Sequence, residues 1–511
     1  MEREGIKTVR ELLYHAACCY GKRTFLRYLE GKEILEKTFL EIKEESTALG
    51  YYLKNQFENH KIHCGIVGRT SCEYIEAYLG TMISGNVIVP LDVKLPAQDI
   101  CELLNQADCE VLFYDDSIAE FLPEIKEKCR QLTCFLELTS NTEENQVGLL
   151  RQEFSGELEN ELDEDDLAAI IFTSGTTGKS KGVMVTHKMV ICNSFAEEYR
   201  NPEDAVVLSL LPIHHIYCVT NDLFLSLRSG NVLCINDSMI HLGKSIRIFQ
   251  PTKMMMVPMI IEEYYKKLEK EVKKSGAGKQ EAKEKIFGKN IQFLYSGGAK
   301  LNPEIIKNYK EYGITIGQSY GMTESFLIAT GVAQDIQNGS VGLPISCMEH
   351  RIAEDGEIQI RGDSVMVGYY KNPEETRKVL TEDGWFSTGD IGKFDDAGLL
   401  HITGRKKNLI ILKNGENVAP EEIEMRFQQE EIVSEVVLTS FDNFNLAVVI
   451  YPDFEWCREN GIEDIYEQLK LVTQKVNDRL PANKRIQKIV MRETEFKKTA
   501  SKKIIRNQEY C

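Results

Sequence analysis

The stretch with the clearest chemistry is a run of glycine, serine, threonine and lysine that begins at Thr173 and ends at Gly182. Glycines let backbone N–H groups approach an anion closely, the hydroxyls donate hydrogen bonds, and Lys179 and Lys181 add positive charge. This combination predicts a cradle for a polyphosphate. The alternative is an ordinary surface turn between two strands, because short glycine patterns often match by chance.

The end of this run, Gly178-Lys179-Ser180, matches the end of a Walker A loop. The position that should hold the opening glycine is Thr173, and a Walker loop leads into a helix whose N-terminus faces the phosphates. Here β-branched residues follow from Gly182 to Thr186, which is typical of a strand. We therefore expect a phosphate loop that joins two strands, and a P-loop phosphohydrolase is the disfavoured alternative.

Two further stretches suit a nucleotide. In Gln318-Ser-Tyr-Gly-Met-Thr-Glu324 the aromatic ring could cover a base, the glycine allows a close approach, and the glutamate could hold Mg²⁺ on the phosphates. In Gly384-Trp-Phe-Ser-Thr-Gly-Asp390 an acid after a glycine turn could accept hydrogen bonds from ribose hydroxyls. A capping aspartate is the alternative for the second stretch.

Length and charge limit the possible classes of protein. A chain of 511 residues exceeds the size at which one core keeps growing, so we expect at least two domains. The formal charge of 61 − 79 = −18 argues against a general nucleic-acid binder. The first residues lack the apolar core of a signal peptide and no run is long enough for a transmembrane helix, so we expect a cytoplasmic protein. The 14 cysteines form no C-x-x-C pair and are expected to be reduced thiols.

The elements that must position these residues follow from the hydrophobic pattern. Between residues 61 and 114 short apolar strands alternate with helical stretches, which predicts a parallel sheet covered by helices. A second α/β rhythm runs from 206 to 330 and contains an exposed helix–loop–helix at 266–289. Short strands with turn signals at 341–403 predict a β-rich subdomain.

The last hundred residues look like a separate lobe, with helices at 420–429 and 463–479 and strands within 435–451. We predict an α/β fold in which a large N-terminal domain of two helix-flanked sheets plus a β-rich subdomain is hinged to a small C-terminal α/β lobe. The predicted domains are 1–404 and 405–511.

Five stretches in this order resemble the adenylate-forming (AMP-binding) superfamily of acyl-CoA synthetases, related ligases and luciferases. They are the loop from Thr173 to Gly182, Tyr320-Gly-Met-Thr-Glu324, Ser387-Thr-Gly-Asp390, the stretch from Gly404 to Glu424, and Thr499-Ala-Ser-Lys-Lys-Ile-Ile-Arg506. The resemblance covers nearly the whole chain, and five ordered motifs are far more specific than one.

The resemblance implies a nucleotide site. The residues implied to bind ATP are Thr173, Ser174, Gly175, Thr176, Thr177, Gly178, Lys179 and Lys181 on the loop, then Gly298, Ala299, Lys300, Gln318, Ser319, Tyr320, Gly321, Met322, Thr323, Asp390, Arg405 and Lys503. The loop would hold the phosphates, Tyr320 would cover the adenine, and Asp390 with Arg405 would hold the ribose. Glu324 with Thr176 matches the magnesium position.

The catalytic residues implied are Lys503, His215 and Thr176. Lys503 matches the lysine that enters the site for adenylation, and Lys407 matches the hinge between the lobes. His215 lies in a stretch that matches the family's acyl pocket and aligns better than His214, while a core or surface histidine is the alternative. No acid lies between 211 and 221 to pair with an amino group, so a plain carboxylic acid is favoured over an amino acid.

The implied reaction joins a carboxylic acid, expected to be a fatty acid, to ATP, giving acyl-AMP and pyrophosphate, and then transfers the acyl group to CoA. The cofactors implied are ATP, Mg²⁺ and CoA. The alternatives are loading of a separate acyl carrier protein and a non-catalytic nucleotide-binding relative. The chain departs from the family pattern at Ser180, Lys502 and Gly404, where a proline, a glycine and an aspartate are usual.

Overall fold

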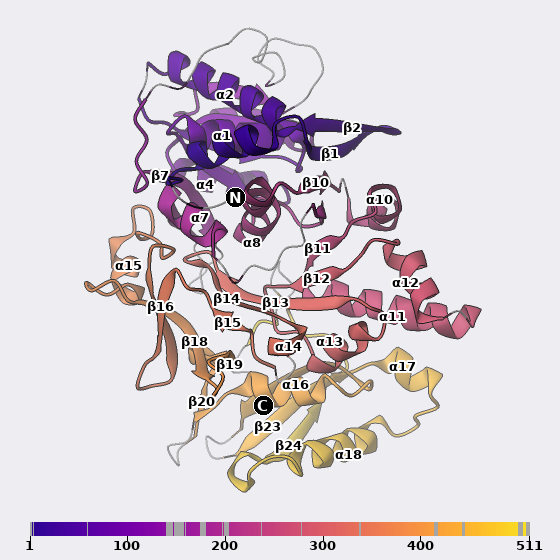
Figure 1. The fold of residues 1–511 in the computed structure, drawn as a ribbon. Coiled ribbons are helices and arrows are strands. Elements are labelled where there is room, and N and C mark those ends of the chain that lie inside the picture. The colour runs from indigo at the N-terminus through magenta and orange to yellow at the C-terminus, as the bar shows by residue number, and fades with distance from the viewer. Residues whose placement is uncertain are drawn as a thin grey trace. The chain divides into compact units, whose positions relative to one another are not determined.

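The structure is a computed structural model of the 511-residue chain. It describes residues 3, 5–58, 60–138, 147, 158, 160–173, 180–196, 198, 204–236, 238–276, 278–336, 339–412, 417–441, 445–498 and 504–506. Figure 1 shows the labelled elements of the chain, and the contacts divide the chain into two compact units. Unit 1 comprises Met1–His350 and Ile360–Phe386, and unit 2 comprises Arg351–Gln359 and Ser387–Cys511. Within the described ranges, no helix has both the length and the apolar character needed to cross a membrane.

The first sheet of unit 1 has six strands in the order β6-β5-β3-β4-β7-β8. Its strands are β3 (His63–Val67), β4 (Val87–Leu91), β5 (Cys109–Tyr114), β6 (Cys134–Glu137), β7 (Leu167–Thr173) and β8 (Lys181–Thr186). The first five run parallel, whereas β8 pairs antiparallel with β7. Strands β3 to β5 are almost entirely buried, as expected for a parallel sheet covered by helices.

The second sheet of unit 1 has nine strands in the order β15-β14-β13-β12-β11-β9-β10-β1-β2. Its strands are β1 (Thr24–Glu30), β2 (Glu33–Thr38), β9 (Val206–Ser209), β10 (Val232–Ile235), β11 (Lys253–Met256), β12 (Phe293–Ser296), β13 (Thr315–Met322), β14 (Phe326–Val332) and β15 (Leu343–Pro344). The strands from β1 to β13 in this order are parallel, so their carboxyl ends share one edge.

Unit 1 also contains helices and short helical turns. They are α1 (Val9–Tyr20), α2 (Phe39–Gln56), α3 (Cys72–Ile83), α4 (Ala97–Gln106), η1 (Asp116–Phe121), α5 (Leu122–Lys128), α7 (His187–Ser194), α8 (Ile216–Cys218), η2 (Val219–Phe224), α9 (Leu225–Ser229), η3 (Met239–His241), α10 (Leu242–Phe249), α11 (Pro258–Ser275), α12 (Lys279–Phe287), α13 (Pro303–Lys310), α14 (Ala333–Ile336) and α15 (Pro373–Val379). Capping boxes start α1 at Thr8 with Glu11 and α2 at Thr38 with Glu41.

A four-stranded sheet has the order β16-β17-β18-β19. Its strands are β16 (Met348–Ile352), β17 (Glu357–Gly362), β18 (Phe386–Phe394) and β19 (Leu400–Arg405). The turn η4 (Lys406–Asn408) follows it, and β20 (Ile410–Ile411) pairs with β21 (Asn417–Val418).

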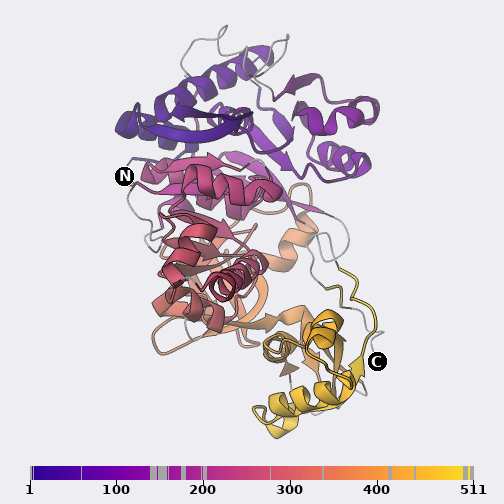
Figure 2. The ribbon, with the colours of Figure 1, turned by 90° about the vertical axis from the view of Figure 1, so that its right-hand side faces the viewer.

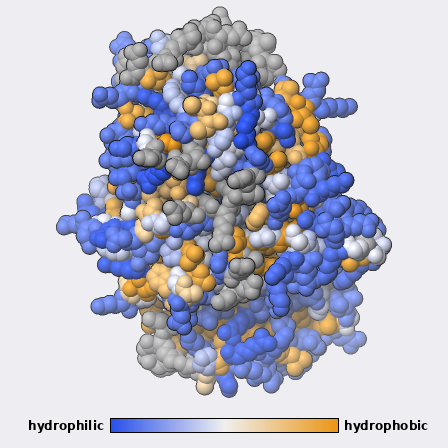
Figure 3. Space-filling model, viewed as in Figure 1, coloured by the Kyte–Doolittle hydropathy of each residue, from blue (hydrophilic) through white to orange (hydrophobic). Residues whose placement is uncertain are grey.

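The rest of unit 2 is a small α/β lobe built on the sheet β22-β23-β24. Its elements are α16 (Pro420–Phe427), β22 (Val433–Ser440), β23 (Leu446–Pro452), α17 (Phe454–Glu459), α18 (Ile465–Asn477), η5 (Ala482–Lys484) and β24 (Ile486–Met491). The yellow helices of this lobe lie against its strands in Figure 2, and Phe427, Val448 and Leu469 are fully buried between them. On the face in Figure 3, hydrophilic residues predominate and hydrophobic residues are scattered among them, as is normal for a globular surface.

The predicted α/β class with two large sheets, a small β-rich region and a C-terminal lobe is confirmed. The exposed helix–loop–helix is also confirmed, because α11 ends at Gly276 in a left-handed conformation and α12 begins at Lys279. Strand β2 was not predicted. The predicted boundary between the domains 1–404 and 405–511, where we expect a hinge, stays a prediction.

Candidate active site

The predicted phosphate loop closes a β-hairpin. Strands β7 and β8 pair antiparallel, and Thr173 lies directly opposite Lys181. A strand therefore follows the loop, as we predicted, and the helix that a Walker loop requires is replaced by β8. The predicted loop residues Ser174, Gly175, Thr176, Thr177, Gly178 and Lys179 lie outside the described residues, as does Lys503.

Lys181 is engaged by a carboxylate that we did not predict. Its Nζ lies 2.5 Å from Glu375 Oε2 at the start of α15, and 5.0 Å from the centre of the Tyr369 ring. Hydrogen bonds from Lys181 and then Lys378 lower the pKa of Glu375 to about 2. The predicted contact of Lys181 with phosphate stays a prediction, and it would have to compete with this ion pair.

The stretch from Gln318 to Glu324 forms strand β13 and the turn into β14. Gln318, Ser319 and Tyr320 are buried, whereas Gly321 is exposed and Met322 and Thr323 are half-buried. A Cβ at Gly321 would lie 2.1 Å from the carbonyl oxygen of Phe326, so the hairpin itself requires glycine here. The proposed approach of a nucleotide to this glycine stays a prediction.

Gly298, Ala299 and Lys300 lie in an exposed loop just after β12. Strands β12 and β13 are parallel, with Ser296 opposite Gln318, so this loop follows the carboxyl end of β12 and Tyr320 lies near the carboxyl end of the adjacent β13. Gly298 has φ of +79°, which favours glycine. The topology thus brings the two predicted adenine-binding segments to one edge of the sheet, where ligands of open α/β sheets bind.

Glu324 is held in place by the segment from Met366 to Tyr370. Its side chain is buried, and its Oε1 accepts a hydrogen bond of 2.9 Å from the hydroxyl of Tyr369. Burial and then the charge of Glu324 raise the pKa of Tyr369, so its hydroxyl stays protonated and donates. We did not predict Tyr369 as a candidate, because its contact with Glu324 joins residues far apart in the sequence.

A nucleotide-bound Mg²⁺ fits this arrangement. Such an ion needs only one or two protein oxygens besides the phosphates. The described part of the chain contains no cluster of three or more His, Cys, Asp or Glu residues suited to an all-protein metal site. Glu324 is a hard oxygen donor at the predicted place, and Thr176 lies outside the described residues.

Asp390 and Arg405 form a pair on neighbouring strands. They lie directly opposite each other on β18 and β19, and Arg405 Nε is 2.7 Å from Asp390 Oδ1. The Asp390 side chain is 5% exposed and that of Arg405 is 44% exposed. The pairing presents a carboxylate fixed by a guanidinium, which suits a diol. We predicted that Asp390 and Arg405 hold the ribose of the same nucleotide whose phosphates the loop binds, and this stays a prediction.

The two histidines of the predicted acyl stretch touch each other. His214 Nε2 lies 3.2 Å from His215 Nε2, and 3.9 Å from Asp92 Oδ2 just after β4. Burial lowers the pKa of both, and His214, which also faces His215, reaches about 3. Both imidazoles are therefore neutral at pH 7. We predicted His215 as the catalytic one of the pair, and that role stays a prediction.

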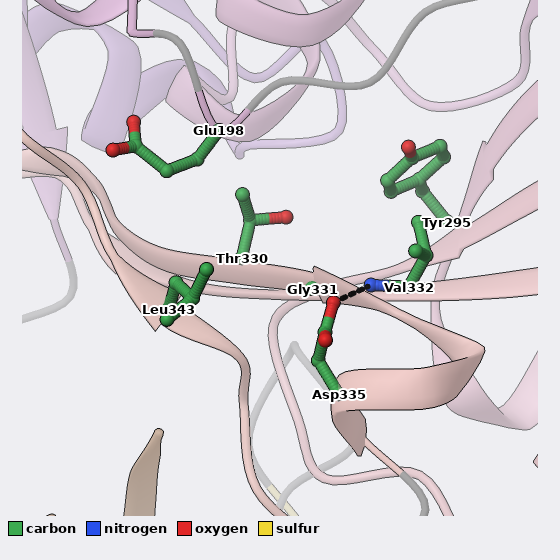
Figure 4. A pocket seen from close by; sticks show the side chains of 7 residues that line it. All are labelled: Glu198, Tyr295, Thr330, Gly331, Val332, Asp335 and Leu343. Atoms are coloured by element: carbon green, nitrogen blue, oxygen red, sulfur yellow. Dashed lines mark hydrogen bonds between the residues drawn. The ribbon is translucent and has the colours of Figure 1, made fainter. Parts of the chain in front are cut away.

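A cavity of about 200 Å³ lies beside strands β12 and β14 (Figure 4). Its lining is Glu198, Tyr295, Thr330, Gly331, Val332, Asp335 and Leu343. The cavity contains none of the predicted site residues. It borders them through Thr330, whose hydroxyl donates to the carbonyl of Gln318. We take the carboxyl edge of the nine-stranded sheet as the candidate site, because the predicted adenine-binding segments and Glu324 lie there.

Solved structures of known proteins share this fold. The anthranilate CoA ligase AuaEII in complex with anthranoyl-AMP superimposes with a TM-score of 0.79 and 18% identity, covering 97% of this chain and 95% of that chain. The chain thus has the fold of adenylate-forming enzymes.

The family models are more specific. The model described as AMP-binding enzyme matches residues 13–370, and the model described as AMP-binding enzyme C-terminal domain matches residues 407–511. The chain therefore belongs to the AMP-binding enzyme family.

Two proteins that are similar to this chain in sequence carry different names. Long chain acyl-CoA synthetase 1 of Arabidopsis thaliana is 28% identical over 510 residues, covering 85% of this chain and 77% of the relative. Malonate–CoA ligase of Arabidopsis thaliana is 29% identical over 413 residues, covering 74% of this chain and 66% of the relative.

Proposed function

We propose that this protein is an ATP-dependent acid–thiol ligase. A carboxylic acid and ATP give acyl-AMP and pyrophosphate, and CoA then takes the acyl group and releases AMP. The observation that carries the proposal is that the 366–370 segment joins the strand after the phosphate loop to Glu324. Its amide N–H at Tyr370 donates to the Gly182 carbonyl, and its amide at Met366 donates to the Glu324 carbonyl. The proposed phosphate loop and the proposed magnesium ligand Glu324 would thereby be parts of one framework.

The proposed roles follow from charge. A carboxylate and an α-phosphate repel each other by about 4 kcal/mol at a separation of about 4 Å if the effective dielectric constant is about 20. Lys503 would remove this barrier by contacting both anions and would stabilise the charge of the transition state. Glu324 and Thr176 would hold Mg²⁺, which neutralises phosphate charge when bound. Asp390 with Arg405 would fix the ribose.

A fatty acid is the proposed acid. The support is the match along 85% of this chain to a relative named as a long chain acyl-CoA synthetase. Neutral His214 and His215 add no cation to select a second carboxylate, which supports a monocarboxylic acid over malonate. CoA is the proposed acceptor because a relative named as a long chain acyl-CoA synthetase matches along 85% of this chain.

The test is pyrophosphate release from ATP with carboxylic acids of graded chain length, with and without CoA, followed by mass analysis of the thioester. We expect release that depends on a fatty acid, and acyl-CoA only when CoA is present. Transfer only to an added acyl carrier protein would replace CoA as the acceptor. No pyrophosphate with any acid would favour the non-catalytic nucleotide-binding relative.

A further inference from the structure

The 366–370 segment grips Glu324 at two points. The amide of Met366 donates to the Glu324 carbonyl at 2.8 Å, and the Tyr369 hydroxyl donates to its carboxylate at 2.9 Å. One contact fixes the backbone and the other fixes the rotation of the carboxylate. Tyr369 is itself only 5% exposed, so its ring cannot turn freely.

The same segment is bound along strand β8. The amide of Met184 donates to the Gly368 carbonyl at 3.0 Å, and the amide of Tyr370 donates to the Gly182 carbonyl at 2.8 Å. Val183 and Tyr369 form an antiparallel bridge between these hydrogen bonds. Tyr369 therefore occupies a fixed place relative to the strand that ends the phosphate loop.

Two further contacts hold Tyr369, one on its ring and one on its backbone. Lys181 lies over the ring, and Glu375 holds that lysine by an ion pair. The backbone amide of Tyr369 donates to the hydroxyl of Thr376 in α15 at 2.9 Å. The aromatic side chain thus connects the lysine at the end of the loop to the buried carboxylate.

We propose that Tyr369 is a positioning residue that orients the Glu324 carboxylate toward a nucleotide-bound divalent cation. The inference rests on the proposed function, because it takes Glu324 as the metal ligand. Groups that hydrogen-bond to a metal's ligands orient them, and their loss commonly weakens metal binding 10- to 100-fold. The hydroxyl of Tyr369 is the group that orients the Glu324 carboxylate in this proposal.

Tyr369→Phe tests the proposal, since phenylalanine keeps the ring over which Lys181 lies and removes only the hydroxyl. Tyr370→Phe is the matched control, because the neighbouring hydroxyl also donates to a carboxylate, Asp108 Oδ2 at 2.7 Å, away from Glu324. Mn²⁺ binding to the full chain with α,β-methylene ATP is measured by electron paramagnetic resonance. We expect about tenfold weaker Mn²⁺ binding in Tyr369→Phe and no change in Tyr370→Phe.

A Glu324→Gln background separates positioning from a general structural effect. Once the ligand carboxylate is gone, adding Tyr369→Phe should weaken Mn²⁺ binding no further, so that the two substitutions are not additive. Wild-type affinity in Tyr369→Phe, equal weakening in both tyrosine variants, or full additivity with Glu324→Gln would overturn the proposal. Absence of pyrophosphate release by the wild type would defeat the proposed function, while the Mn²⁺ affinities would still decide the role of Tyr369.

Discussion

Arg506 ties the C-terminal motif to helix α16 through a buried carboxylate. Its Nη1 lies 2.9 Å from Glu424 Oε1, and its Nη2 contacts Glu424 Oε2. The amide of Leu438 also donates to Glu424, at 2.6 Å. Burial raises the pKa of Glu424, and Arg506 opposes that effect. Arg506→Met would leave this carboxylate buried without its cation.

The cost can be worked out from these contacts. Removing one partner of a buried ion pair costs about 3–5 kcal/mol. The side chain of Glu424 is 6% exposed but that of Arg506 is 27% exposed, so water already screens part of the attraction. We expect Arg506→Met to lower the free energy of unfolding of unit 2 by about 2–3 kcal/mol. Glu424→Gln with Arg506→Met should lose less than the sum of the single changes.

The assay uses the two tryptophans of the chain, Trp385 in unit 1 and Trp456 in unit 2. In a Trp385→Phe background, urea unfolding followed by fluorescence reports on Trp456 alone. Arg458→Met is the matched control, because Arg458 is exposed on α17 and should change stability by less than about 0.5 kcal/mol. A loss below about 0.5 kcal/mol in Arg506→Met, or full additivity with Glu424→Gln, would refute the reasoning.

Three further predictions concern pH, the β13–β14 hairpin and the adenylation step. Burial lowers the pKa of His187 and His214 to about 3, so the stabilising neutral state is complete above the unfolded pKa of about 6.5 and is lost as the pH falls toward 3. Between pH 7 and pH 5, urea unfolding should show that the free energy of unfolding falls by about 2 kcal/mol for each of the two histidines. In His187→Gln the fall should be smaller by the contribution of one histidine. A pH-independent stability in that range would contradict it. Gly321→Ala should cost about 2 kcal/mol or more in thermal or urea unfolding because its Cβ meets the Phe326 carbonyl, whereas Gly278→Ala, with open space around it, should be tolerated; equal stabilities would be the contrary result. Lys503→Ala should abolish acyl-AMP in rapid-quench assays and leave equilibrium ATP binding within about twofold, and an unchanged adenylation rate would show that another cation serves.

The local elements were predictable because their signals are local. Within the predicted alternation of strands and helices at 61–114, the apolar run from Val87 to Leu91 forms β4, and within the predicted helix–loop–helix Gly276 ends α11. The β-branched residues from Gly182 to Thr186 identified a strand after the phosphate loop. Strand β2 was missed because half of its six residues are charged and none is buried, so its sequence lacks the apolar alternation of a half-buried strand.

The partners of the site residues could not be predicted, because they come from distant parts of the chain. Glu375 lies 194 residues from Lys181, and Tyr369 lies 45 residues from Glu324. No local spacing encodes such contacts. Asp390 and Arg405 were paired through the family resemblance, and the hairpin of β18 and β19 gives the physical reason that they meet.

The most direct measurement of the central claim is the identity of the nucleotide product formed from ATP in the presence of a fatty acid and Mg²⁺. Chromatography of a reaction with labelled ATP should show AMP and pyrophosphate in equal amounts, with formation dependent on both the acid and CoA for full turnover. ADP and inorganic phosphate, or cleavage that does not depend on an acid, would contradict an acyl-adenylate mechanism.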